Sequence, residues 1–208
     1  GATYRVAATY AGDPGDAPAT FAVKLPAQDD AVRERVALGF LSEVEFYSTV
    51  TTQMAIPVPG CFHSEISSDG ADFVLLMADM APAVQGDQIA GCTTDEAALA
   101  VEALAGLHGP SWGDRRWFDL PSIVMPKPGD AEAAKGLGDV AVMAADITLD
   151  KLGGKVSDED RLTLTTSMGL VTPWLMAEPE RFSLMHGDYR LDNLLFDPER
   201  TRVTVVDW

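Results

Sequence analysis

The pattern of apolar residues changes its period part-way along the chain, and this change restricts the fold more than any other feature. Up to Met77 the predicted elements are strand, strand, long helix, strand and strand, and the pattern after Met77 is mainly helical. A run of strands followed by a run of helices is typical of an α+β architecture. We therefore expect a first lobe over residues 1–78, with a small antiparallel sheet and one long helix, and a mostly helical second lobe over residues 79–208.

Turn-forming residues and apolar spacing set the expected boundaries of these elements. A segment dense in Gly, Pro and Asp, residues 11–18, separates the first two strands and predicts a hairpin with a long tip. A Pro-rich stretch at 120–129 predicts a loop. Strands are expected over 3–10, 20–25, 60–66, 72–77, 193–196 and 202–206, and helices over 31–53, 94–107, 130–151 and 157–177.

The composition is that of a globular protein, because 47% of the 208 residues are hydrophobic and 23% are charged. No uncharged apolar run is long enough to span a membrane, and the first residues lack a secretory signal pattern. We therefore predict a cytoplasmic protein with no membrane partner. Both ends of the sequence have the pattern of a strand without a capping segment, so we expect part of a longer protein, with the C-terminal part of the helical lobe missing.

Charge and cysteine content exclude two classes of site. The formal net charge of −17 would repel a nucleic-acid backbone, so nucleic acid is excluded as a partner. An acidic surface of this kind either steers a cationic substrate, such as an aminoglycoside, or is simply solvated. Cys61 and Cys92 have neither a CxxC spacing nor paired histidines nearby, so two free thiols are expected rather than a disulfide or a zinc site.

The strongest motif is the segment 184–196, Leu-Met-His-Gly-Asp-Tyr-Arg-Leu-Asp-Asn-Leu-Leu-Phe, which is followed at 203–208 by Val-Thr-Val-Val-Asp-Trp. Phosphoryl transfer explains this grouping. A carboxylate on a tight loop, Asp188, is suited to orient an acceptor hydroxyl and take its proton. Magnesium prefers oxygen ligands, which the amide of Asn193 and the carboxylate of Asp207 would supply. A turn at 197–200 would bring Asp207 back beside the loop.

These residues resemble the aminoglycoside phosphotransferase and choline/ecdysteroid-kinase-like superfamily, whose catalytic loop reads His-Gly-Asp-x-x-x-x-Asn and whose metal-binding Asp follows an apolar strand. The resemblance implies a bilobal protein-kinase-like fold and transfer of the ATP γ-phosphoryl group to a hydroxyl of a small molecule. It implies Asp188 as the catalytic base and Asn193 and Asp207 as Mg²⁺ ligands. His186 is expected to brace the loop. Asp192 is either a solvated carboxylate or a contact to phosphate or acceptor.

A kinase also needs a cation on the nucleotide phosphates. Lys24 ends an alternating strand, and the resemblance implies that a glutamate on the following helix holds it in place. Glu43 and Glu45 lie about 200° apart on a helix, so only one of them can face Lys24, and helical geometry does not choose between them. The family pattern favours Glu43, which precedes the pair Phe46-Tyr47 by three positions.

The segment 73–79 has the place of the strand and hinge that hold adenine in this family, so the resemblance implies backbone contacts to adenine from Met77 and Ala78. It also implies that Asp87 lies near the ribose. His108, before Gly109-Pro110, is expected to be a cap or core contact. The alternatives are a nucleotide-binding pseudokinase or regulatory module without turnover, and a helical adaptor without ATP binding. The acceptor stays open among aminoglycosides, amino alcohols, sugars and steroid-like alcohols.

Overall fold

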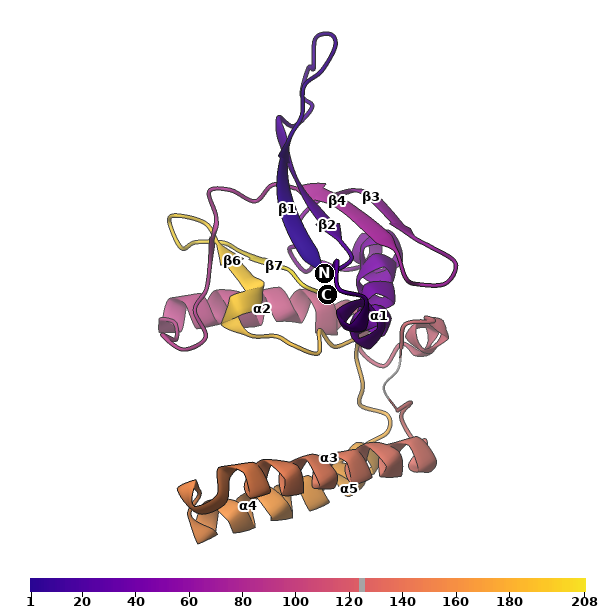
Figure 1. Cartoon of the computed structure of the whole chain (residues 1–208), viewed down its shortest axis with the longest axis vertical. Coiled ribbons are helices and arrows are strands. Elements are labelled where there is room, and N and C mark those ends of the chain that lie inside the picture. Colours follow the sequence, from indigo (N-terminus) through magenta and orange to yellow (C-terminus); the bar gives the residue numbers. More distant parts are fainter. Residues whose placement is uncertain (124–125) are drawn as a thin grey trace. The chain divides into compact units, whose positions relative to one another are not determined.

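The computed structural model describes residues 1–123 and 126–208, with the backbone alone at 30–32 and 34–38. The chain forms two compact units (Figure 1). The first comprises Gly1–Trp112 and Ser183–Trp208, and the second comprises Gly113–Phe182. The lobe boundary expected after residue 78 lies inside the first unit and stays a prediction.

A four-stranded antiparallel sheet forms one side of the first unit. Its strand order is β1-β2-β4-β3. In β4, alternate residues Phe73, Leu75 and Met77 are buried, as the period of two in a strand requires. The strands are β1 (Ala2–Ala7), β2 (Thr20–Leu25), β3 (Cys61–Ile66) and β4 (Phe73–Ala78).

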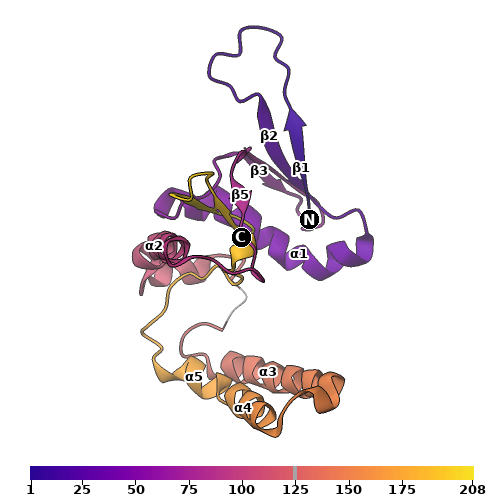
Figure 2. The same ribbon diagram turned by 90° about the vertical axis from the view of Figure 1, so that its left-hand side faces the viewer.

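Helix α1 (Asp30–Glu45) packs against β3 and β4 (Figure 2). The rings of Phe40 and Phe73 lie 4.4 Å apart in this contact. The expected helix over 31–53 is present as one continuous helical segment that changes its hydrogen-bond period. A π-helical turn, η1 (Phe46–Val50), and a 3₁₀ turn, η2 (Thr51–Gln53), follow α1 directly. Single π-helical turns occur often at functional sites.

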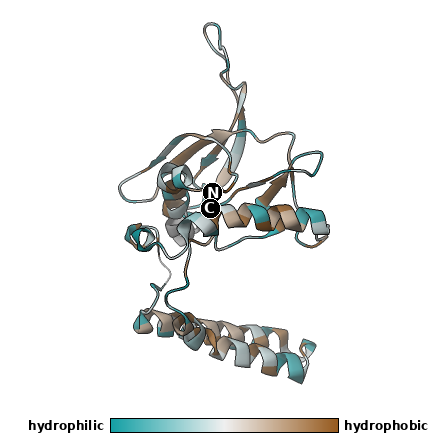
Figure 3. Cartoon of the chain, turned by 180° about the vertical axis from the view of Figure 1, so that it is seen from behind, coloured by the Kyte–Doolittle hydropathy of each residue, from teal (hydrophilic) through white to brown (hydrophobic). Residues whose placement is uncertain are grey.

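Helix α2 (Thr94–Ser111) begins with the capping box formed by Thr93 and Glu96. It continues past the expected end at 107 and includes Pro110 in its last turn. Proline cannot bond to the carbonyl four residues earlier. That carbonyl, on Gly106, instead accepts a hydrogen bond of 3.0 Å from the amide of Ala55. Figure 3 shows apolar residues alternating with polar ones along α2.

A second, three-stranded antiparallel sheet packs on α2 through β7. Leu194, Phe196, Val203 and Val205 are buried in this contact region, while Leu195 and Thr204 alternate with them on the other face. The strand order is β5-β6-β7. The strands are β5 (Val84–Gln85), β6 (Leu194–Phe196) and β7 (Val203–Val205).

The second unit is helical. The close approach of α3 to α5 depends on Gly138, because a Cβ there would lie 2.0 Å from Oγ1 of Thr172. The single helix expected over 157–177 is divided at Leu170, where α4 ends and α5 begins. The helices are η3 (Arg115–Asp119), α3 (Ala131–Leu152), η4 (Gly153–Lys155), α4 (Asp158–Gly169) and α5 (Val171–Ala177).

The secondary structure confirms the α+β class expected from the sequence. Among the described residues, none of the helices combines the length and the apolar composition that crossing a membrane requires.

Candidate functional site

Lys24 connects two acidic side chains from distant parts of the first unit. Its Nζ lies 2.7 Å from Oε1 and 2.6 Å from Oε2 of Glu43, and 2.5 Å from Oδ1 of Asp207. Strand β2 carries Lys24, α1 carries Glu43, and Asp207 follows β7. Lys24 is 9% exposed and Glu43 is 3% exposed, so both charges of this pair are removed from water.

Burial and pairing act in opposite directions on the ionisation of these groups. Burial opposes the charge of Lys24, but the carboxylates of Glu43 and Asp207 outweigh it and raise the pKa of the ammonium. Burial raises the pKa of Glu43, against the attraction of Lys24. Burial would also raise the pKa of Asp207, yet its hydrogen bond and ion pair with Lys24 lower it. Lys24 is therefore a cation and Asp207 an anion at neutral pH.

The backbone at Asp207 adopts a left-handed conformation, with φ of 66°, which is uncommon for a residue with a side chain. The flanking residues hold it there. The amide of Val206 donates to the carbonyl of Asn193 at 3.0 Å. The ring of Trp208 stacks on that of Phe46, with centroids 3.6 Å apart. Unusual backbone conformations persist where the surroundings fix them, and they cluster at functional sites.

His186 joins the loop that begins at Gly187 to the segment that ends at Asp207. Its Nε2 lies 3.0 Å from the carbonyl of Val206, and the amide of Asp188 donates to its Nδ1 at 3.3 Å. These two contacts require a neutral ring that carries its proton on Nε2. Burial lowers the pKa of His186, which favours the same neutral form. These are the contacts expected of a residue that braces the loop.

Asp188 and Asn193, which lie at two ends of the same loop, are hydrogen-bonded to each other. Nδ2 of Asn193 donates to the carbonyl of Asp188 at 2.9 Å and to its Oδ2 at 3.2 Å. The 3₁₀ turn η5 (Leu191–Asn193) produces this return of the chain. Asn193 is buried, whereas Asp188 is exposed. Both of these bonds use Nδ2, so the amide oxygen of Asn193 takes no part in them.

Arg190 is a residue of this loop whose contacts the sequence analysis missed. Its Nε lies 3.1 Å from Oδ2 of Asp188, and its Nη1 lies 3.2 Å from Oδ2 of Asp192. Oδ1 of Asp192 accepts from the amide of Gln88 at 3.2 Å. Asp192 thus binds protein groups, which neither of the two readings of its role included. The only signal in the sequence was an arginine two positions from each aspartate.

The predicted adenine-binding and ribose-binding residues lie in two further places. Met77 is buried in β4, and the amide of Ala78 donates to the carbonyl of Gly60 at 2.8 Å, so a contact from Ala78 to adenine would use its carbonyl. The carboxylate of Asp87 accepts from the amides of Ile89 and Ala90, at 2.9 and 3.0 Å. These bonds lower the pKa of Asp87 and make it the cap of its own turn.

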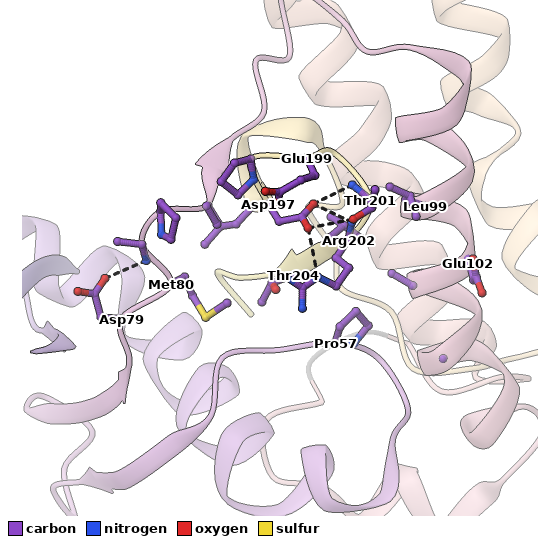
Figure 4. A pocket seen from close by; sticks show the side chains of 18 of the residues that line it. Pro57, Asp79, Met80, Leu99, Glu102, Asp197, Glu199, Thr201, Arg202 and Thr204 are labelled. Carbon is purple, nitrogen blue, oxygen red and sulfur yellow. Dashed lines mark hydrogen bonds and ion pairs between the residues drawn. The ribbon is translucent and has the colours of Figure 1, made fainter. Parts of the chain in front are cut away.

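A pocket of about 860 Å³ lies elsewhere in the first unit (Figure 4). Its walls come from the segment after β4, from α2 and from the β6–β7 hairpin. Figure 4 shows Asp79 bonded to the backbone beside it, and Asp197 bonded to the residues of its own turn. Of the site residues predicted from the sequence, all of which are described, none lines this pocket. The pocket is therefore distinct from the cluster around Lys24.

The two oxygen ligands predicted from the sequence would suit a magnesium ion only if a nucleotide shared it. Among the described residues, no group of three or more His, Cys, Asp and Glu side chains is placed to hold a metal ion. Asp207 and the amide oxygen of Asn193 would supply only two ligands. Magnesium is commonly bound in this way, through one or two protein oxygens together with phosphates and water.

Comparison with known proteins gives one match. A model of the family described as "Phosphotransferase enzyme family" matches residues 8–208. No curated protein and no solved structure matches the chain. The matched range includes every site residue predicted from the sequence.

Proposed function

Because the chain belongs to the phosphotransferase enzyme family, we propose that it transfers the γ-phosphoryl group of ATP to a hydroxyl of a small molecule. The family match confirms the resemblance found in the sequence, and the α+β secondary structure is that of a protein-kinase-like fold. The finer statements, on ATP, magnesium and the role of each residue, are our proposal.

One observation carries the proposal. Lys24 contacts Glu43 and Asp207, and the residue before Asp207 is hydrogen-bonded to Asn193, whose side chain contacts Asp188. A cation, two oxygen ligands and a carboxylate base are thus linked through a short series of contacts within the first unit. Phosphoryl transfer needs these groups and little else from a protein, because its catalysis is mostly positioning and charge stabilisation.

Each group has a role that its environment permits. Bound magnesium would bridge phosphate oxygens and neutralise their charge. Asn193 and Asp207 would hold that ion through side-chain oxygens. The ammonium of Lys24, kept in place by Glu43, would bind phosphate oxygens in addition to Asp207. Among the described residues, Asn193 and Arg190 bond to the carboxylate of Asp188 at Oδ2, so its Oδ1 would accept the proton of the acceptor hydroxyl.

The test is to measure ADP release from Mg-ATP while the acceptor is varied among aminoglycosides, amino alcohols, sugars and steroid-like alcohols. We expect turnover with one class, and a loss of about 10²–10⁴-fold in Asp188→Asn, because general-base catalysis contributes that much. Asp188 is exposed, so the variant should keep its stability. The matched control is Asp16→Asn, which changes an exposed aspartate in the β1–β2 connection and should keep full activity.

Two outcomes count against this proposal. Binding of Mg-ATP without ADP release for every acceptor supports the alternative of a nucleotide-binding module without turnover. If calorimetry detects no magnesium-dependent binding of ATP, both the kinase and that alternative are ruled out.

A further inference from the structure

A short segment, residues 85–88, is hydrogen-bonded to the loop that carries Asp188 and Asn193. We call this segment the clasp. Backbone and side-chain groups both contribute, and the bonds involve groups of the loop between residues 191 and 194. The pairs are Gln85 Nε2 to the carbonyl of Asp192, Gly86 N to the carbonyl of Leu194 at 2.9 Å, Gln88 N to Oδ1 of Asp192 at 3.2 Å, and Leu191 N to Oε1 of Gln88 at 2.8 Å.

The clasp and the loop approach each other closely at Gly86. A Cβ at this position would lie 2.6 Å from the carbonyl oxygen of Leu191, whereas ordinary contacts begin at 3.4 Å. Any larger residue would therefore displace the loop or the clasp by roughly 0.8 Å, the difference between the two distances. The close approach is the reason that glycine is required here. Its backbone conformation is not the reason, since its φ is not in the left-handed region.

The clasp is itself held in place. Strand β5 pairs with β6, with Gln85 opposite Leu195, so the first residue of the clasp is fixed to the sheet that follows the loop. The carboxylate of Asp87 caps the turn immediately after it, through the amides of Ile89 and Ala90. The clasp is thus a supported structure and not a free loop.

The loop needs such support because much of it is exposed. Asp188 and Arg190 are exposed, and Leu191 and Asp192 are only half-buried. Apolar packing therefore fixes these residues weakly. The clasp holds Asp192, Asp192 contacts Arg190, and Arg190 contacts Oδ2 of Asp188. Through this series of contacts, the clasp affects the position of the carboxylate that we assign as the base.

We propose that Gln88 and Gly86 are positioning residues, which keep the loop where Asp188 faces the acceptor hydroxyl. This inference rests on the proposed function. A clasp of this kind acts on catalysis more than on nucleotide affinity, because Lys24, on a different element, remains in place to bind phosphate. A misplacement of about 1 Å costs up to about 100-fold in rate.

The experiment measures the release of ADP from Mg-ATP in the presence of the acceptor class that supports turnover, the affinity for Mg-ATP by calorimetry, and the melting temperature, for the parent and four variants. In Gly86→Ala we expect kcat to fall by about 10–100-fold. In Gln88→Met, which keeps the side-chain length but loses the acceptor, we expect about 10-fold. In both variants the affinity for Mg-ATP should stay within about 3-fold of the parent.

Two control variants separate positioning from a general loss of structure. Gln88→Glu keeps an oxygen acceptor for the amide of Leu191 and should recover kcat to within about 3-fold of the parent. Gly12→Ala adds a Cβ where no atom lies within 4 Å, and should have no effect. If Gly86→Ala proves unstable, the comparison of Gln88→Met with Gln88→Glu decides the question by itself.

Three outcomes would overturn the inference. An active parent with unchanged kcat in Gln88→Met and Gly86→Ala removes the positioning role and leaves the proposed function intact. Equal defects in Gln88→Met and Gln88→Glu do the same, because the lost acceptor would then not be the cause. A parent that releases no ADP from Mg-ATP with any acceptor overturns the proposed function together with this inference.

Discussion

The candidate site has a buried half and an exposed half, and the two are held by different forces. In the buried half, Lys24 and Glu43 stand on a strand and a helix whose packing fixes their positions. In the exposed half, Asp188 stands on a loop that depends on hydrogen bonds with His186, Asn193 and the clasp. The comparison shows that a single site joins groups fixed by the core to groups fixed by polar contacts.

This difference predicts how each half responds to mutation. Removing one partner of a buried ion pair leaves an uncompensated charge and costs about 3–5 kcal/mol. Substitutions of exposed residues usually change stability by no more than about 0.5 kcal/mol. Changes in the buried half should therefore lower stability and activity together, whereas changes at Asp188 should lower activity alone.

The largest effect is expected for Lys24→Ala. We expect turnover to fall by about 10³-fold, because a preorganised cation at the phosphates is lost. The free energy of unfolding should fall by about 3 kcal/mol, because Glu43 is left buried and unpaired. Steady-state kinetics and urea denaturation measure the two effects. Adding Glu43→Gln should restore stability and not turnover. An unchanged rate in Lys24→Ala would break the distinction between the halves.

A smaller effect is expected for Asp207→Asn, a change at the residue that joins the two halves of the site. Asparagine tolerates the left-handed backbone at this position better than alanine does, so the variant tests the charge and not the conformation. We expect the affinity for ATP to lose its dependence on magnesium and turnover to fall by about 10²-fold. Calorimetry with and without magnesium measures this. Asp72→Asn, on an exposed residue, should behave like the parent. A variant that binds Mg-ATP as the parent does would remove Asp207 from the metal site.

The smallest effect concerns the pH dependence of stability through His186. Its pKa in the folded protein lies below the ordinary value of 6.5, so the unfolded chain binds a proton first as the pH falls. The contribution of His186 is thus fully present above pH 6.5 and is lost as the pH falls from 6.5 through the depressed folded pKa. Protonation would also break the bond from the amide of Asp188 to Nδ1.

Melting temperatures between pH 7.5 and 5.5 test this prediction. In His186→Gln the melting temperature should decline less than in the parent, because the group whose pKa is lowered by folding is gone. His63→Gln, on an exposed histidine of β3, should decline as the parent does. Equal declines in all three proteins would show that His186 does not couple the loop to pH.

Some features of the fold could be predicted from the sequence because they depend on local spacing. The strands expected over 20–25 and 72–77 and the helix expected to begin at 94 are examples. The end of α2 and the break at Leu170 were not predicted. Helix α2 continues through Pro110 because Ala55, from a distant segment, satisfies the carbonyl of Gly106. Local propensity contains no information on such a partner.

The candidate site likewise has some features that could be predicted from the sequence and others that could not. The sequence by itself determined which residue types are available: a lysine on a strand, a glutamate on a helix and the aspartates and asparagine of a recognisable motif. The pairing of Lys24 with Glu43 was also expected, from the family resemblance. Only the tertiary structure decided that Lys24 contacts Asp207 as well, that Arg190 contacts Asp188, and that residues 85–88 hold the loop. The physical reason is that these contacts join residues far apart in the chain or residues of an irregular loop, where neither the helical nor the strand period relates sequence spacing to direction in space.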